Sequence, residues 1–86
     1  MCTYITESIP ASGSGKGATG WFSLTEASVY LDHPVHAPAD HTLNIDFLNP
    51  ALGPAARVAV ELTAETALAL ARAIESTLAT APAGLT

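Results

Sequence analysis

Basic residues are almost missing from this chain. Only Lys16, Arg57 and Arg72 carry a positive charge, against eight acidic residues, and the net charge is −5. Proteins that bind nucleic acid need clustered basic side chains to neutralise phosphates, so this balance argues against a nucleic-acid partner. Long apolar runs are missing too: the longest, Ala67–Ala71, is far below the roughly 20 residues of a membrane-spanning helix. We therefore expect neither nucleic acid nor a membrane as a partner.

Cysteine and aromatic residues are also scarce. The single cysteine, Cys2, excludes an internal disulfide, and aromatic residues make up only 6% of the chain. With 86 residues, rich in alanine, the chain forms one domain with a shallow core. Small domains of this kind are often stabilised by a metal or a second subunit, so we expect a homo-oligomer. One free thiol and the lack of a signal-peptide pattern favour a cytoplasmic protein.

Alternation of polar and apolar residues predicts four strands. Pro10 is expected to end the first of them, and four glycines predict a loop over Ala11–Gly20. Pro34 and Pro38 interrupt pairing after the second strand. The predicted strands are Thr3–Ile9, Trp21–Asp32, His41–Leu48 and Arg57–Leu62.

A helix is predicted after the last strand. Thr63 is a suitable N-cap, Glu65 lies in the first turn, and no glycine or proline follows before Pro82. Apolar residues recur at helical spacing and predict a face that covers the sheet. These residues are Ala67, Leu70, Ala71, Ile74 and Leu78.

The predicted fold class is therefore α+β. We expect a four-stranded, mostly antiparallel sheet (ββββα) with one C-terminal helix packed on one face. Residues 1–80 would form the domain and 81–86 a flexible tail. The second sheet face, with Tyr4, Tyr30, Asn44 and Asp46, is left for water or another subunit.

All three histidines, His33, His36 and His41, lie in the segment Asp32–His41. Neutral imidazole is a ligand for zinc, copper, nickel and iron, and three protein ligands are usual in a catalytic zinc site. Strand alternation places His33 and His41 at the same end of the core if their strands pair antiparallel. The segment therefore predicts a transition-metal site, with zinc as the first choice.

Other residues are candidates to complete this site. Asp32 and Asp40 each precede a histidine and are suited to hold its ring or to bind the metal themselves. Cys2 would supply a thiolate, although its alternation with Tyr4 places it on the opposite face. The spacing H-x-x-H-x-x-x-x-H has no fixed mechanism, so the alternative is a polar loop whose histidines are hydrogen-bonded at strand ends.

The glycine-rich segment Gly15–Gly20 matches the pattern G-x-G-x-x-G. A dinucleotide site would need a strand before it and a helix after it, and here Trp21-Phe22 follows instead. The residues Gly15, Lys16 and Gly17 are left either as an anion-binding loop or as an ordinary surface loop. No nucleophile–base pair can be assembled, so the residues assign no reaction.

Several strings of residues resemble a small family of actinobacterial proteins of unknown function, over essentially the whole chain. The resemblance implies no activity and no site residues. The strings are Met1-Cys2-Thr3-Tyr4 at the start, Ser12–Ala18, Trp21-Phe22, Asp32-His33-Pro34-Val35-His36-Ala37-Pro38 and Asn44–Phe47.

Three functions are open at this point. The first is a small metal-binding protein, which would be catalytic if the metal kept an open position. The second is a non-catalytic module that oligomerises or docks a partner, with structural histidines. The third is a binder of anionic small molecules.

Overall fold

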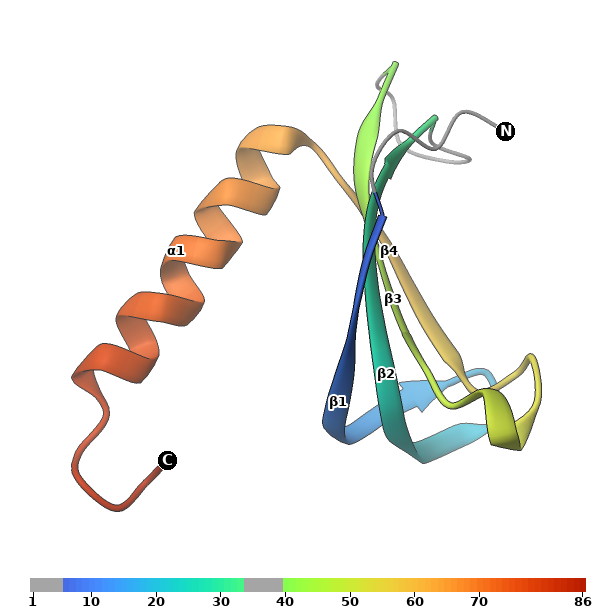
Figure 1. The fold of residues 1–86 in the computed structure, drawn as a ribbon, viewed down its shortest axis with the longest axis horizontal. Helices are drawn as coiled ribbons and strands as arrows, with labels where there is room; N and C mark the ends of the chain where they lie inside the picture. Colours follow the sequence, from blue (N-terminus) through green and yellow to red (C-terminus); the bar gives the residue numbers. More distant parts are fainter. Residues whose placement is uncertain (1–5, 34–39) are drawn as a thin grey trace.

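The computed structural model describes residues 6–33 and 40–86, which form one sheet followed by one helix (Figure 1). All neighbouring strands are antiparallel and follow one another in chain order across the sheet. The predicted α+β class is confirmed. The elements are β1 (Thr6–Gly17), β2 (Gly20–Asp32), β3 (Thr42–Leu48), the short 3-10 helix η1 (Pro50–Leu52), β4 (Arg57–Leu62) and α1 (Ala64–Thr80).

The first two strands form one long hairpin, so the predicted loop over Ala11–Gly20 is wrong. β1 continues through Pro10 to Gly17, and its ladder with β2 reaches the turn at Ala18 and Thr19. Proline is tolerated because β1 is an edge strand. The register shifts between Pro10 and Gly13, and such a bulge bends the strand. The start of the predicted first strand, residues 3–5, lies outside the described residues.

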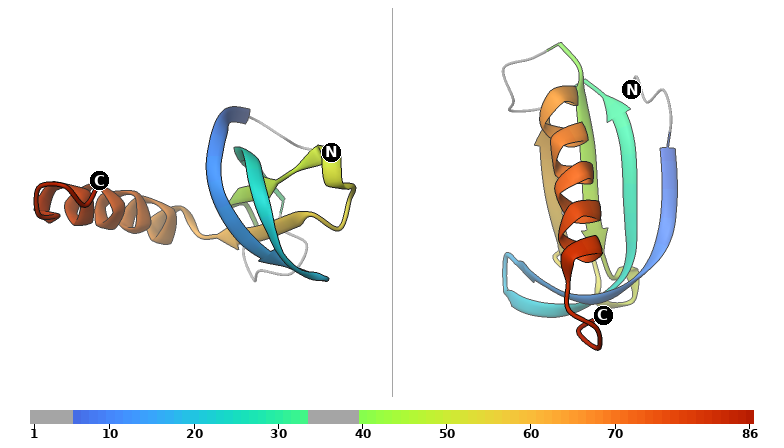
Figure 2. Two further views of the ribbon diagram at one scale, coloured as in Figure 1. Left: turned by 90° about the horizontal axis from the view of Figure 1, so that it is seen from below. Right: turned by 90° about the vertical axis from the view of Figure 1, so that its left-hand side faces the viewer.

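The far end of this hairpin curls across the sheet and packs against β4 (Figure 2). A Cβ atom placed on Gly15 would lie 3.2 Å from Leu24 Cδ2 and 3.3 Å from Val58 Cγ2. One placed on Gly17 would lie 3.1 Å from the carbonyl oxygen of Ala55. The glycines that suggested a loop are therefore explained by close packing of the hairpin.

Replacing these two glycines by alanine should have unequal effects. In Gly17→Ala the new methyl group meets a backbone carbonyl that cannot move away, so we expect a loss of about 2–3 kcal/mol in the free energy of unfolding. In Gly15→Ala the methyl group meets only side-chain ends that can rotate, and the loss should stay below about 1 kcal/mol. Urea denaturation of both variants measures the difference; equal losses would contradict this packing.

One face of the sheet is apolar, and we call it the apolar sheet face. Val29, Ile45 and Val60 stand opposite one another across three strands, with Glu7 of β1 beside Val29 at the sheet edge, and the rows on either side are apolar. Ala27 is buried, Ile9 is 59% exposed, and the other eight members of the face are partly buried. The face comprises Ile9, Ala27, Val29, Leu31, Leu43, Ile45, Phe47, Val58, Val60 and Leu62.

The helix begins where the sequence predicts. The Thr63 side chain accepts a hydrogen bond from the backbone N–H of Thr66 at 3.2 Å, and Glu65 lies in the first turn. This satisfies one of the free N–H groups at the helix start. Within residues 6–33 and 40–86 no helix is long and apolar enough to cross a membrane.

The prediction that α1 packs on the sheet is wrong. The helix leaves the end of β4 and diverges from the sheet along its length (Figures 1 and 2). None of its residues is buried. Only Thr63, in an extended conformation, connects Leu62 at the end of β4 to Ala64 at the start of α1. Connections between a helix and a strand usually take two to six residues, so a single residue leaves α1 little room to turn back onto its own sheet.

The interior is correspondingly small. Of the described apolar side chains, only Ala27 and Ala56 are buried. The radius of gyration is 14.3 Å, whereas a compact chain of this length has about 12 Å. The sheet and helix are thus formed, but the apolar side chains of the sheet face are mostly only partly buried and those of α1 are mostly exposed. The expected division into a domain ending at residue 80 and a flexible tail stays a prediction.

Candidate functional site

The structure brings His33 and His41 together, as the strand alternation predicted. Their ring centroids are 4.7 Å apart, with an angle of 31° between the ring planes. His33 Nδ1 lies 3.0 Å from the backbone carbonyl oxygen of Asp40. A carbonyl oxygen can only accept a hydrogen bond, so this contact requires the proton on Nδ1. The backbone N–H of His33 donates to Asp32 Oδ1 at 2.7 Å.

These contacts do not build a metal centre. Across residues 6–33 and 40–86, no group of three or more His, Cys, Asp or Glu side chains could hold a metal ion. Metal ligation requires ring nitrogens that converge on one point, whereas the His33 and His41 rings are tilted by 31° at a centroid distance of 4.7 Å and Nδ1 of His33 is turned to a carbonyl. The predicted metal-binding function is therefore wrong, and so is the cofactor, whether zinc, nickel, copper or iron.

Two of the predicted ligands, Cys2 and His36, lie outside the described residues. Asp32 and Asp40 were expected either to hold a histidine ring through their carboxylates or to bind the metal themselves. In the structure Asp32 accepts from the backbone of His33, and Asp40 contacts the ring of His33 through its own backbone carbonyl. The described part of the segment is thus a hydrogen-bonded junction between β2 and β3.

A polar network on the other sheet face was missed by the sequence analysis. Arg57 Nη2 donates to both carboxylate oxygens of Asp46, at 3.0 and 3.1 Å, and Tyr30 Oη donates to Asp46 Oδ2 at 3.0 Å. The Asp46 side chain is only 14% exposed, whereas that of Arg57 is 52% exposed. Alternation along each strand placed Tyr30 and Asp46 on one face, but only the strand register shows that Arg57 reaches them. The three groups satisfy one another and present no nucleophile.

Three polar residues are better buried than most of the apolar ones. Thr42 is 1% exposed and donates to Asn44 Oδ1 at 2.6 Å. The Asn49 side chain accepts from the backbone N–H of Ala51 and donates to the carbonyl oxygen of Ser23 at 2.9 Å. Asn49 thus caps η1 and ties it to β2. These bonds fix the sheet, and across residues 6–33 and 40–86 every buried side-chain nitrogen and oxygen has a hydrogen-bond partner.

The network predicts a change of stability at alkaline pH. Burial raises the pKa of the Tyr30 hydroxyl above its ordinary value of 10.0, and the hydrogen bond to Asp46 raises it further. As the pH rises, the hydroxyl of Tyr30 therefore loses its proton in the unfolded chain before it does so in the folded chain. The stability that this hydroxyl gives the folded chain is complete below pH 10 and is lost as the pH rises through the pKa of Tyr30 in the folded state. Between about pH 9 and pH 11, the urea midpoint should fall further in the natural chain than in Tyr30→Phe. An equal fall in both would contradict this role of Tyr30.

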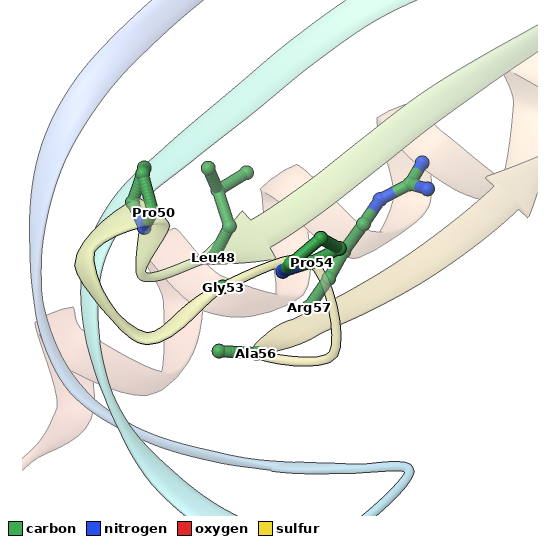
Figure 3. Close-up of a pocket in the computed structure, with 6 residues that line it drawn as sticks. All are labelled: Leu48, Pro50, Gly53, Pro54, Ala56 and Arg57. Carbon is green, nitrogen blue, oxygen red and sulfur yellow. The ribbon is translucent and has the colours of Figure 1, made fainter.

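An open depression of about 290 Å³ lies beside η1 (Figure 3). The six residues that line it are Leu48, Pro50, Gly53, Pro54, Ala56 and Arg57. Arg57 supplies the one charged side chain there, and its guanidinium is engaged by Asp46. This depression therefore lacks the convergent polar groups that a small-molecule site uses.

Four of the eight large apolar side chains that are exposed among the described residues lie on α1. Leu70, Ile74 and Leu78 are 42%, 53% and 59% exposed, and with Ala67 and Ala71 they form what we call the helix stripe. A shallow groove on α1 is lined by Leu70, Ala73, Ile74, Thr77 and Leu78. Monomeric proteins rarely leave such contiguous apolar surface in water. Together, the helix stripe and the apolar sheet face are the candidate functional surface.

Comparison with known proteins gives a family and no activity. The model of a family described as a "Family of unknown function (DUF6295)" matches residues 1–86, the whole chain. No curated protein and no solved structure matches.

Proposed function

The chain belongs to this family of unknown function, DUF6295, and we propose that it is a non-catalytic association module. Its working parts are the apolar sheet face and the helix stripe, which become covered by another protein surface. The histidines are structural and hold the junction between β2 and β3.

The exposed area carries this proposal. The chain exposes 6240 Å², whereas a folded monomer of 8.8 kDa exposes about 4,800 Å². The excess of about 1,400 Å² per chain is more than the roughly 800 Å² that each partner contributes to a standard interface. Burial of apolar surface is the main favourable term in association, so covering this excess stabilises the assembly.

A second argument for this proposal is that the polar side chains bond to other groups of the sheet. The described titratable groups with close partners, such as Asp46, Arg57 and His33, make hydrogen bonds within the sheet and its junctions. A catalytic group would instead point into a cavity, with a partner that activates it. The open depression beside η1 holds no such pair.

A matched pair of helix variants tests the proposal. Ile74 and Leu68 are both 53% exposed on α1, but Ile74 lies on the helix stripe and Leu68 lies about 120° away from it around the helix. Ile74→Glu would bury a carboxylate in the assembly, so we expect at least about a 100-fold weaker association. Leu68→Glu should associate like the natural chain. Sedimentation velocity over a range of concentrations measures both.

Two results would contradict the proposal. One is a natural chain that stays monomeric at every concentration while its circular dichroism shows a folded protein. The other is equal weakening by the two variants, which would place the contact elsewhere on α1.

A further inference from the structure

The helix stripe and the apolar sheet face point to one occupant, and we propose that it is a second copy of this chain. Two chains exchange their helices: α1 of each lies on the apolar sheet face of the other. This inference rests on the proposed function, because it names the partner that covers those surfaces.

The connector between β4 and α1 is the first support. Thr63 alone separates the two elements, and it also caps the helix through its bond to the N–H of Thr66. Folding α1 back onto its own sheet would need more connecting residues or would break this cap. A connection too short to let an element pack within its own chain is the usual route to an exchange between copies.

The two surfaces also match in length and in kind. The 17 residues of α1 span about 25 Å, and the 7 residues of β3 span about 23 Å. The stripe presents Leu70, Ile74 and Leu78, and the sheet presents β-branched residues such as Ile45 and Val60. An apolar helix side and an apolar sheet side form the layered core that an α+β domain normally has within one chain.

The arrangement closes with two chains. Each copy offers one helix stripe and one apolar sheet face, so a twofold pair satisfies all four surfaces at once. If each chain covered its excess of about 1,400 Å², the interface would bury about 2,800 Å² in total. That is within the range of about 2,000–5,000 Å² found for obligate homodimers.

The test detects contacts between copies directly. Chain labelled with ¹³C and ¹⁵N is mixed 1:1 with unlabelled full-length chain, unfolded and refolded together, and studied by isotope-filtered NOE spectroscopy. We expect intermolecular cross-peaks that join the methyl groups of Ile74 and Leu78 to those of Ile45 and Val60. The same mixture prepared from Ile74→Glu should lose them.

Two other outcomes would overturn the exchange, and they differ in whether the proposed association module survives. A dimer whose intermolecular cross-peaks join only helix to helix, or only sheet to sheet, removes the exchange and keeps the association module. A chain that is monomeric at every concentration removes both.

Discussion

Inserting Gly-Ser-Gly-Ser between Leu62 and Thr63 is expected to turn the exchanged dimer into a monomer. The insertion leaves Thr63 next to Ala64, so the N-cap is kept. Four added residues reach up to about 14 Å, enough to carry the chain from the sheet to a helix layer about 10 Å above it. The helix can then cover its own sheet, at an effective concentration that is millimolar for a short flexible linker. At micromolar protein concentration, the closed monomer should therefore be the main species.

Multi-angle light scattering measures this change as a fall of the molar mass by half, with unchanged circular dichroism. The control is the same four residues inserted after Ala81, beyond the end of α1, where the dimer should persist. If the insertion before Thr63 leaves a dimer, the short connector is not what drives the exchange.

Replacing Asp46 by alanine is expected to cost about 2–3 kcal/mol of the free energy of unfolding. The change removes the acceptor for Tyr30 Oη and for two hydrogen bonds from Arg57. The Arg57 guanidinium is half exposed, so water can replace the hydrogen bonds that it loses. Most of the lost stability therefore comes from the Tyr30 hydroxyl and from the changed side chain in the central strand β3. Asp46→Asn keeps one acceptor and should lose about half as much.

Urea denaturation at one fixed protein concentration measures these losses, because the stability of a dimer depends on concentration. Glu75→Ala, an exposed acidic position on α1, is the control and should change stability by less than about 0.5 kcal/mol. The double variant Tyr30→Phe with Asp46→Ala should lose less free energy of unfolding than the sum of the two single variants, since both changes remove the same hydrogen bond. A fully additive double variant would contradict the network.

The elements with clear periodicity could be predicted from the sequence. Strand β4 has the predicted bounds, Arg57–Leu62, and the cap at Thr63 is where the residue pattern places it. These features depend on local chemistry: alternation in a strand and an oxygen that accepts from free N–H groups. The family resemblance was confirmed as well, because a family of unknown function matches the whole chain.

The hairpin could not be predicted, because glycines in a sequence are compatible both with a flexible loop and with closely packed strands. Gly15 and Gly17 suggest a flexible loop, yet their role depends on Val58 and Ala55, which are distant in sequence. The packing of α1 was mispredicted for a related reason. Periodicity tells which side of a helix is apolar, but the length of the connector decides which sheet it can cover.

The candidate site shifted from the histidines to the apolar surfaces. The approach of His33 and His41 followed from strand alternation, but whether two rings share a metal or stack depends on torsions that sequence does not encode. The arrangement of Arg57 with Asp46 required the register of β3 and β4. The sequence predicts that α1 covers the apolar sheet face, and only the structure shows that the helix diverges from the sheet.

Sedimentation equilibrium of the unmodified chain tests the central claim most directly. With the helix exchanged between two copies, the molar mass should be twice 8.8 kDa across the micromolar range, and dissociation should require strong dilution. A mass of 8.8 kDa at every concentration, with the helix and sheet intact by circular dichroism, would contradict it.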